Sequence, residues 1–325
     1  MKANLQSVLT DCTRAGYGEG AGGGCVLLSS SDSAGPHRER LGWLEASHLL
    51  FPALAYNFDV SRLWAKIALD TVDSQLPSGM VPDIAPEYTV FAGGFRDSPE
   101  WGSAAVLNPY WLYEWYGNAA VLNETYATAV AYVDYLLTRR TPACTLDYGL
   151  GDWIPVVPSP PGVTATAILV QDLDALAVTA AALGHAAAAA NYTALSRAVA
   201  AAYQAAFGGA SGGAYPTQCA AGMALTLGIT PAAAVAAARA YMVDDVSERG
   251  ACGGAAVRVS RRAMRGGRAG NVTTSGEIGN RYALLALADV PGGGGIAAVW
   301  ASLLRTDSPG VEGGLWRSGA AGTLP

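Results

Sequence analysis

The chain has 325 residues and a net charge of −6, and only 14% of its residues are charged, so its overall charge does not favour nucleic acid as a partner. It contains no run of about 18 strongly apolar residues, which predicts no membrane-spanning helix, and its start lacks the apolar segment of a signal peptide. Five scattered cysteines without CxxC spacing argue against a zinc site or a dense disulfide framework, and we expect neither metal nor cofactor.

Helical periodicity recurs along the chain, whereas the period of two that strands require is almost absent. Irregular segments at 80–95 and 148–162, rich in Gly and Pro, separate some of the helical segments. Helix pairs that recur at roughly 45–60 residues predict an all-α toroid of hairpins in one domain, 1–325, with an α-solenoid as the alternative. Helices are expected at 44–56, 60–75, 99–116, 119–139, 163–183, 186–207, 231–243, 277–288 and 295–304.

The stretch 36–48 concentrates charged and aromatic side chains in a chain that otherwise has few charges. Glu39 and Glu45 lie six residues apart with Trp43 between them. Cleavage at an anomeric carbon uses two carboxyl groups, and a flat ring can cover the C–H face of a sugar. A solvated loop followed by a charged helix start is the other interpretation, because Glu45 would suit a first turn.

The segment 36–43, PHRERLGW, resembles the signature of the α-L-rhamnosidases of glycoside hydrolase family 78. In that family an Asp-Cys pair directly precedes the Pro, whereas here Asp11 and Cys12 lie upstream of a Gly- and Ser-rich segment, 13–35. We interpret 13–35 as an insertion that is disordered, either a translated intron or a real surface loop. Closing a loop of this length costs only about a few kcal/mol in chain entropy. Asp11 can therefore still lie beside Glu39 if the segment is a real loop.

Three further segments resemble family blocks in the family's order. Segment 94–104, GFRDSPEWGSA, offers Asp97, Glu100 and Trp101, although Asp97 could instead be an N-cap before Pro99. Segment 148–153, YGLGDW, offers Asp152 and a stacking Trp153, and a turn with a core Trp is the alternative there. Segment 273–282 offers Glu277, with Thr274 or Ser275 as the expected cap of the following helix. Trp111 and Trp115 lie one helical turn apart and are expected in the core.

A second intrusion, 251–270, carries arginines among glycines and splits another block. We expect a solvated, disordered loop there, as for 13–35, because a basic run of this kind is usually solvated. Nucleic-acid binding by such a run is the rarer case. The sequence ends at Pro325, just before the position of the family's general base. The resemblance therefore predicts a fragment that lacks this base. It also predicts a toroid that is incomplete at its C-terminal end. Three N-glycosylation triplets permit a secreted location.

The resemblance implies an inverting hydrolase of terminal α-L-rhamnosides that acts on a rhamnose-containing oligosaccharide or glycoside. Glu39 would be the general acid, with Asp11 and Glu45 as further catalytic candidates. The residues expected to bind the sugar are Trp43, Asp97, Glu100, Trp101, Asp152, Trp153 and Glu277. We expect Glu39, Trp43, Trp101 and Asp152 to converge on one concave surface.

Two other functions stay open on the sequence. A rhamnosyl-glucuronate lyase acting by β-elimination would need a base and a cation beside the uronate. His37 or His48 and Arg38 or Arg96 could supply these groups. The second alternative is an inactive carbohydrate-binding fragment that keeps the tryptophan platform.

Overall fold

The computed structural model describes residues 41–209, 213–248 and 273–303, and the chain divides into two compact units. The first unit comprises 1–140 and 168–197, and the second comprises 141–167 and 198–325. The expected insertions, 13–35 and 251–270, lie outside the described residues, as do Asp11, His37, Arg38 and Glu39, so these remain predictions.

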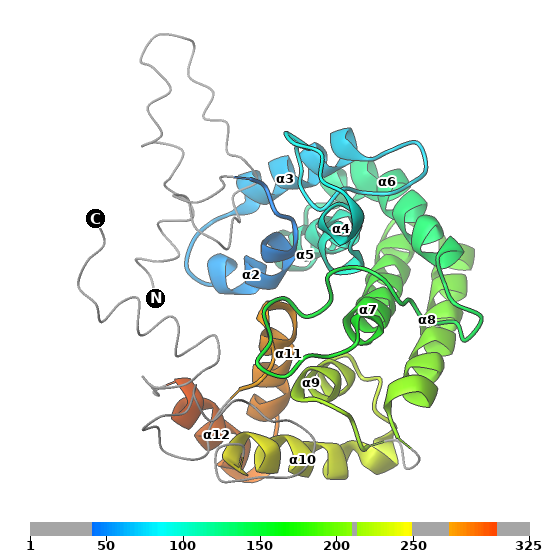
Figure 1. The fold of residues 1–325 in the computed structure, drawn as a ribbon. Helices are drawn as coiled ribbons and strands as arrows, with labels where there is room; N and C mark the ends of the chain where they lie inside the picture. Colours follow the sequence, from blue (N-terminus) through cyan, green and yellow to red (C-terminus); the bar gives the residue numbers. More distant parts are fainter. Residues whose placement is uncertain (1–40, 210–212, 249–272, 304–325) are drawn as a thin grey trace. The chain divides into compact units, whose positions relative to one another are not determined.

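The all-α prediction is confirmed for the described part of the chain, where the only β pairing is an isolated bridge between Trp43 and Ile84. The first unit contains α2 (Glu45–Ala55), α3 (Ser61–Ser74), the 3₁₀ turn η1 (Gly93–Phe95), α4 (Pro99–Gly102), α5 (Ala104–Tyr116) and α6 (Ala119–Thr138), as Figure 1 shows. The second contains α9 (Gln218–Thr226), η2 (Ala232–Ala234), α10 (Val235–Glu248), α11 (Glu277–Ala288), η3 (Pro291–Gly293) and α12 (Gly294–Leu303). Helices α7 (Pro161–Ala182) and α8 (Ala186–Phe207) contribute residues to both units.

Two expectations about the helices were wrong. The single helix expected at 99–116 is broken at Ser103, whose ψ of −13° departs from the value of about −42° in an α-helix. The Ser103 hydroxyl donates to the Pro99 carbonyl at 2.6 Å, a local side-chain bond that competes with regular helix geometry. Helix α9 was not expected at all, because its small and apolar residues are buried on every side and so show no amphipathic stripe. The side chain of Thr217 caps it by accepting the Ala220 N–H at 3.1 Å.

An aromatic cluster forms the core between α2, α3 and α5 in the first unit. Phe51 contacts Trp64 edge-on with ring centres 5.3 Å apart, lies parallel to Trp111 at 6.3 Å and meets Trp115 edge-on at 5.9 Å. Trp111 and Trp115 pack against this core, as the sequence predicted.

A glycine allows α9 and α11 to pack closely in the second unit (Figure 1). A Cβ atom added at Gly222 would lie 2.7 Å from the backbone N and Cα of Ala283. Any side chain at residue 222 would therefore push the two helices apart.

Helix α7 is long and apolar enough to cross a membrane by length and composition, but 72% of its most apolar window is buried inside the protein. Burial of this kind is what a core helix shows, and it explains why α7 is apolar on nearly all sides.

Candidate functional site

In the first unit, residues 42–44 of the signature lie alongside residues 83–85 of the irregular segment. The Leu44 N–H donates to the Asp83 carbonyl at 2.9 Å, and the Ala85 N–H donates to the Gly42 carbonyl at 3.1 Å. This short antiparallel contact places the half-buried Trp43 opposite Ile84, forty-one residues away in the sequence.

The ring of Trp43 packs against two partly exposed phenylalanines. It stacks on Phe91 with ring centres 5.6 Å apart and an interplanar angle of 23°, and it meets Phe95 edge-on at 6.4 Å. Phe91 and Phe95 are also in contact, at 6.4 Å. The three rings therefore form an aromatic cluster that fixes the orientation of Trp43.

The second signature block forms the turn α4, whose start is held by a carboxylate that the sequence analysis did not consider. Asp83 Oδ1 accepts the Ser98 N–H at 2.8 Å. The alternative interpretation of Asp97 as an N-cap was wrong: Ser98 occupies the N-cap position, and its N–H donates to Asp83. Glu100 and Trp101, which α4 carries, are both buried, at 0% and 2% exposure.

Asp83 lies in an environment that disfavours a negative charge. Its side chain is fully buried, and burial raises the pKa of this carboxyl well above its ordinary value, with the nearby charges of Glu100 and Asp97 adding to the effect. The hydrogen bond from the Ser98 N–H opposes this shift but does not cancel it. Burial and the neighbouring like charges therefore favour the neutral form of Asp83.

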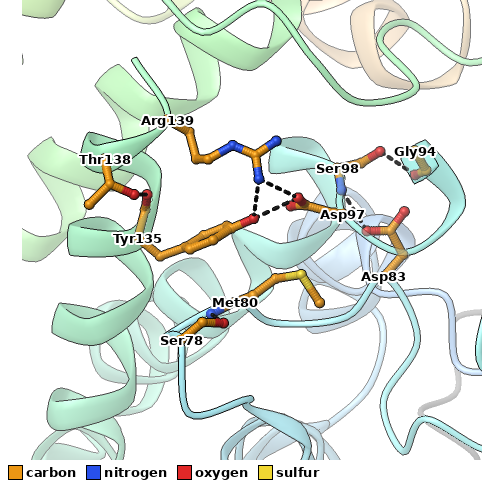
Figure 2. A network of polar contacts seen from close by, with 9 residues as sticks. All are labelled: Ser78, Met80, Asp83, Gly94, Asp97, Ser98, Tyr135, Thr138 and Arg139. Carbon is orange, nitrogen blue, oxygen red and sulfur yellow. Dashed lines mark hydrogen bonds and ion pairs between the residues drawn. The ribbon is translucent and has the colours of Figure 1, made fainter. Parts of the chain in front are cut away.

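Asp97 belongs to a polar network with Tyr135 of α6 and Arg139 at the end of that helix (Figure 2). Its Oδ2 accepts the Tyr135 hydroxyl at 2.6 Å and lies 3.2 Å from Nη1 of Arg139, which also donates to that hydroxyl at 2.9 Å. Arg96 turns instead to Glu87 and forms a two-pronged ion pair at 2.7 and 3.0 Å.

The two acid and base candidates on α2 are both buried. Glu45 is 3% exposed and His48 is fully buried, and Nε2 of His48 donates to the Glu100 backbone carbonyl at 2.7 Å. His48 thereby ties α2 to α4, which is a structural use of one of the two imidazoles, His37 and His48, that the lyase interpretation offers as a base.

In the second unit, Asp152 bridges its loop to the start of α11. Its Oδ2 accepts the Gly276 N–H at 2.7 Å and its Oδ1 accepts the Gly279 N–H at 2.8 Å. The expected cap by Thr274 or Ser275 was wrong, because Gly276 is the N-cap residue and Asp152 supplies the acceptor from 124 residues away. Burial raises the pKa of Asp152, while the donors from Gly279, Gly276, Cys219 and Ile278 act against that rise.

The same loop carries Trp153, whose backbone carbonyl accepts the Glu277 N–H at 2.8 Å. Trp153 and Glu277 are both half-buried. Gln218 on α9 completes the support by accepting the Thr274 N–H at 2.8 Å and donating to Asp245 at 2.8 Å. The structure thus brings Asp152, Trp153 and Glu277 together, as a brace around the first turn of α11.

No group of three or more His, Cys, Asp or Glu side chains is placed to hold a metal ion within the ranges that the structure describes.

The comparisons with known proteins agree on one family. The family model of the bacterial alpha-L-rhamnosidase 6 hairpin glycosidase domain matches residues 28–263, which is well over half of the chain. The chain belongs to this six-hairpin rhamnosidase family. This membership confirms the resemblance and the six-hairpin fold class that the sequence motifs predicted.

Among curated relatives, this chain is 32% identical over 151 residues to an alpha-L-rhamnosidase of Streptomyces avermitilis. The match covers 46% of this chain and 14% of that protein. It is 30% identical over 127 residues to an alpha-L-rhamnosidase of Formosa agariphila, covering 37% and 13%. The chain therefore spans less than a fifth of the length of these relatives.

Two solved structures share the fold. The Streptomyces avermitilis alpha-L-rhamnosidase in complex with L-rhamnose has a TM-score of 0.67 and 26% identity, over 82% of this chain and 23% of that one. The native rhamnosidase of Aspergillus terreus has a TM-score of 0.73 over 97% of this chain and 34% of that one, and at 21% identity it supports the fold alone.

Sequence analysis missed two buried acids, Asp83 and Asp172. Each was visible as a charged residue inside an apolar run, MVPDIA at 80–85 and AILVQDLDALAV at 167–178. Buried acids are rare unless they serve a partner, so an acid in such a run is a signal worth following.

Proposed function

We propose that this protein is a glycoside hydrolase that cleaves terminal α-L-rhamnosides by an inverting acid/base mechanism. The match of the rhamnosidase domain over 28–263, which includes the signature around Glu39, is the observation that carries this proposal. The solved Streptomyces relative, complexed with L-rhamnose, supports a rhamnose-containing substrate.

Glu39 is assigned as the general acid, with Asp11 as its partner in the signature. Trp43, four residues after Glu39, is assigned as the sugar platform. Two arguments support this role: backbone hydrogen bonds hold residues 42 and 44 against residues 83 and 85, and Phe91 backs the indole ring at 5.6 Å. A ring held on one side offers a flat surface at little cost in conformational entropy.

The remaining candidates divide by their exposure. Asp97, Trp153 and Glu277 are half-buried, so a ligand can reach their polar atoms or ring edges. Glu45, Glu100, Trp101 and Asp152 are buried, and we assign each of them to holding the elements around it within its own unit. Asp97 is oriented by its contacts with Tyr135 and Arg139, and we assign it to a sugar hydroxyl.

Hydrolysis of an aryl α-L-rhamnoside tests the proposal, measured on a chain that continues past Pro325 through the position of the family's general base, because an inverting mechanism needs both the acid and the base. Glu39→Gln should lower the rate about 10²–10⁴-fold, the usual loss when a general acid is removed. Glu124→Gln, an isosteric change at an exposed position on α6, serves as the matched control and should leave the rate unchanged. The sugar released first should have the inverted β configuration at its anomeric carbon, observed by NMR.

Three results would contradict the proposal. An unsaturated, ultraviolet-absorbing uronate released from a rhamnosyl-glucuronate substrate would identify a lyase. Binding of L-rhamnose by titration calorimetry, with no turnover of any rhamnoside, would identify a carbohydrate-binding protein. Release of the retained α anomer would exclude the inverting mechanism.

A further inference from the structure

Beneath the turn α4, two oxygen–oxygen contacts compete for a single hydroxyl proton. Ser103 Oγ lies 2.6 Å from the Pro99 carbonyl oxygen and 2.6 Å from Oδ2 of Asp172 on α7. Both separations are those of strong hydrogen bonds, and each therefore needs a proton between its two oxygens. A serine hydroxyl has one proton to donate, and a carbonyl oxygen has none.

The second proton must come from the carboxyl group. If Ser103 donates to Pro99, Oδ2 of Asp172 has to carry a proton and donate it to Ser103 Oγ. If Ser103 instead donated to an ionised Asp172, its oxygen would face the Pro99 carbonyl oxygen at 2.6 Å with no proton between them, which is repulsive.

The surroundings of Asp172 agree with the neutral form. The side chain is fully buried, and Oδ1 has no hydrogen-bond partner in the described part of the chain. Burial raises the pKa of this carboxyl well above its ordinary value. A hydrogen bond donated by Ser103 would act against this rise, whereas one that Asp172 donates to Ser103 favours the neutral form. No charged group of the described residues acts on it. The other acid on this part of α7, Asp174, has Ser196 as its partner.

The turn held by this chain of hydrogen bonds is the one that carries Glu100 and Trp101. Ser103 directly follows α4, and the carbonyl of Pro99, the first residue of α4, accepts from Ser103 Oγ and also from the Tyr132 hydroxyl at 3.2 Å. A side chain on α7 is thereby connected, through one serine, to both ends of α4.

We infer that Asp172 is held as a neutral carboxylic acid and that it acts as a positioning residue, orienting the Glu100–Trp101 turn through Ser103. This role is independent of the proposed rhamnosidase activity, because it depends only on contacts within the first unit. Asp172 does not touch the reacting atoms in this assignment.

The direct test follows the carboxyl group of the full wild-type chain by ¹³C NMR with labelled aspartate. The Asp172 resonance, assigned by its loss in Asp172→Asn, should stay at the chemical shift of a protonated carboxyl from pH 5 to pH 8. An Asp172 resonance that titrates with a midpoint near the ordinary aspartate value would overturn the inference. Because this measurement uses the unaltered protein, it does not depend on the folding of any variant beyond the assignment.

The positioning role is tested with 5-fluorotryptophan and ¹⁹F NMR, using Trp101→Phe to assign the Trp101 signal. Asp172→Asn, whose amide can still donate to Ser103, should leave that signal in place, whereas Asp172→Leu, similar in size but without a donor, should shift it. In the Ser103→Ala background the two substitutions should have the same effect on the Trp101 signal. If Asp172→Leu leaves the signal unmoved, or if Asp172→Asn moves it as far as Asp172→Leu, the positioning role is refuted.

Discussion

The starts of α4 in the first unit and α11 in the second are each held by a buried aspartate from a distant loop. The two aspartates differ in the hydrogen-bond donors and the charges that surround them. Asp83 accepts one backbone N–H, from Ser98, and has the carboxylates of Glu100 and Asp97 nearby. Asp152 accepts from Gly276 and Gly279 on its two oxygens, with further donors from Ile278 and Cys219.

The difference shows that, between two acids buried to a similar extent, the donors and the neighbouring charges set how far the pKa rises. Both side chains are almost fully buried. The pKa of Asp83 rises well above its ordinary value because burial and like charges outweigh a single donor, whereas the rise for Asp152 is smaller because several donors and the N-terminus of a twelve-residue helix favour the anion.

The largest effect is expected from Asp152→Ala. It removes the acceptor of two buried N–H groups, and each charged bond is worth about 1.5–3 kcal/mol, so the free energy of unfolding should fall by about 3–6 kcal/mol. Urea denaturation measures it, with Asp152→Asn expected to lose less because its carbonyl still accepts. Asp147→Ala, at an exposed position in the same loop region, is the neutral control. A loss below about 1 kcal/mol would mean that the brace around α11 does not stabilise the fold.

Gly222→Ala tests whether α11 is held by close packing as well as by Asp152. The new Cβ would lie 2.7 Å from backbone atoms of Ala283, and overpacking of this kind costs about 1–3 kcal/mol. Thermal unfolding should show a lower Tm. The matched control is Gly294→Ala at the start of α12, where a Cβ meets nothing within 4 Å, and this change should be neutral or slightly stabilising. Equal effects from both substitutions would contradict the packing argument.

Asp83→Asn tests whether the raised pKa of Asp83 makes the stability of the protein depend on pH. Because the folded pKa of Asp83 is raised by burial, the folded state binds more protons than the unfolded state between the ordinary value of 3.8 and the folded pKa. Wild-type stability should therefore decrease as pH rises through that window, by up to about 1.4 kcal/mol per pH unit from this group.

Urea midpoints measured from pH 4 to pH 8 check this sign. The difference between Asp83→Asn and the wild type should move in favour of the variant as pH rises, since an amide has no proton to lose. A difference that is constant with pH would show that Asp83 titrates alike in the folded and unfolded states.

The smallest effect is expected from Lys66→Ala on α3. Lys66 pairs with Asp70 one helical turn away, and its side chain is 44% exposed to solvent. Such surface pairs contribute about 0.2–0.5 kcal/mol, and salt weakens them. A loss larger than about 1 kcal/mol would show that exposed charges here matter as much as the buried acids do.

Local sequence predicted most helices well, because helix periodicity and end signals are properties of neighbouring residues. Helix α11 begins and ends where its apolar spacing indicated, and Gly117 stops α5 in the left-handed conformation with φ +65°. Asn118 then caps α6 by accepting the Val121 N–H at 3.2 Å. Helix α9 escaped prediction because complete burial erases the contrast between its faces.

The sequence predicted which residues belong to the candidate site. It did not predict which residues they pair with. The motifs identified the family, and they marked Trp43, Asp97, Trp101, Asp152 and Glu277 for attention. No spacing in the sequence indicated that Asp97 would pair with Tyr135 and Arg139 while Asp83 satisfied Ser98 in its place.

By itself, then, the sequence determined most of the helices, the family and the residue types available for chemistry, since these depend on patterns within a few turns or one motif. The tertiary structure decided the state of each acid. Charge on a buried carboxyl depends on which donors and which other carboxylates surround it, and for Asp83, Asp152 and Asp172 those neighbours come from segments 15 to 127 residues away.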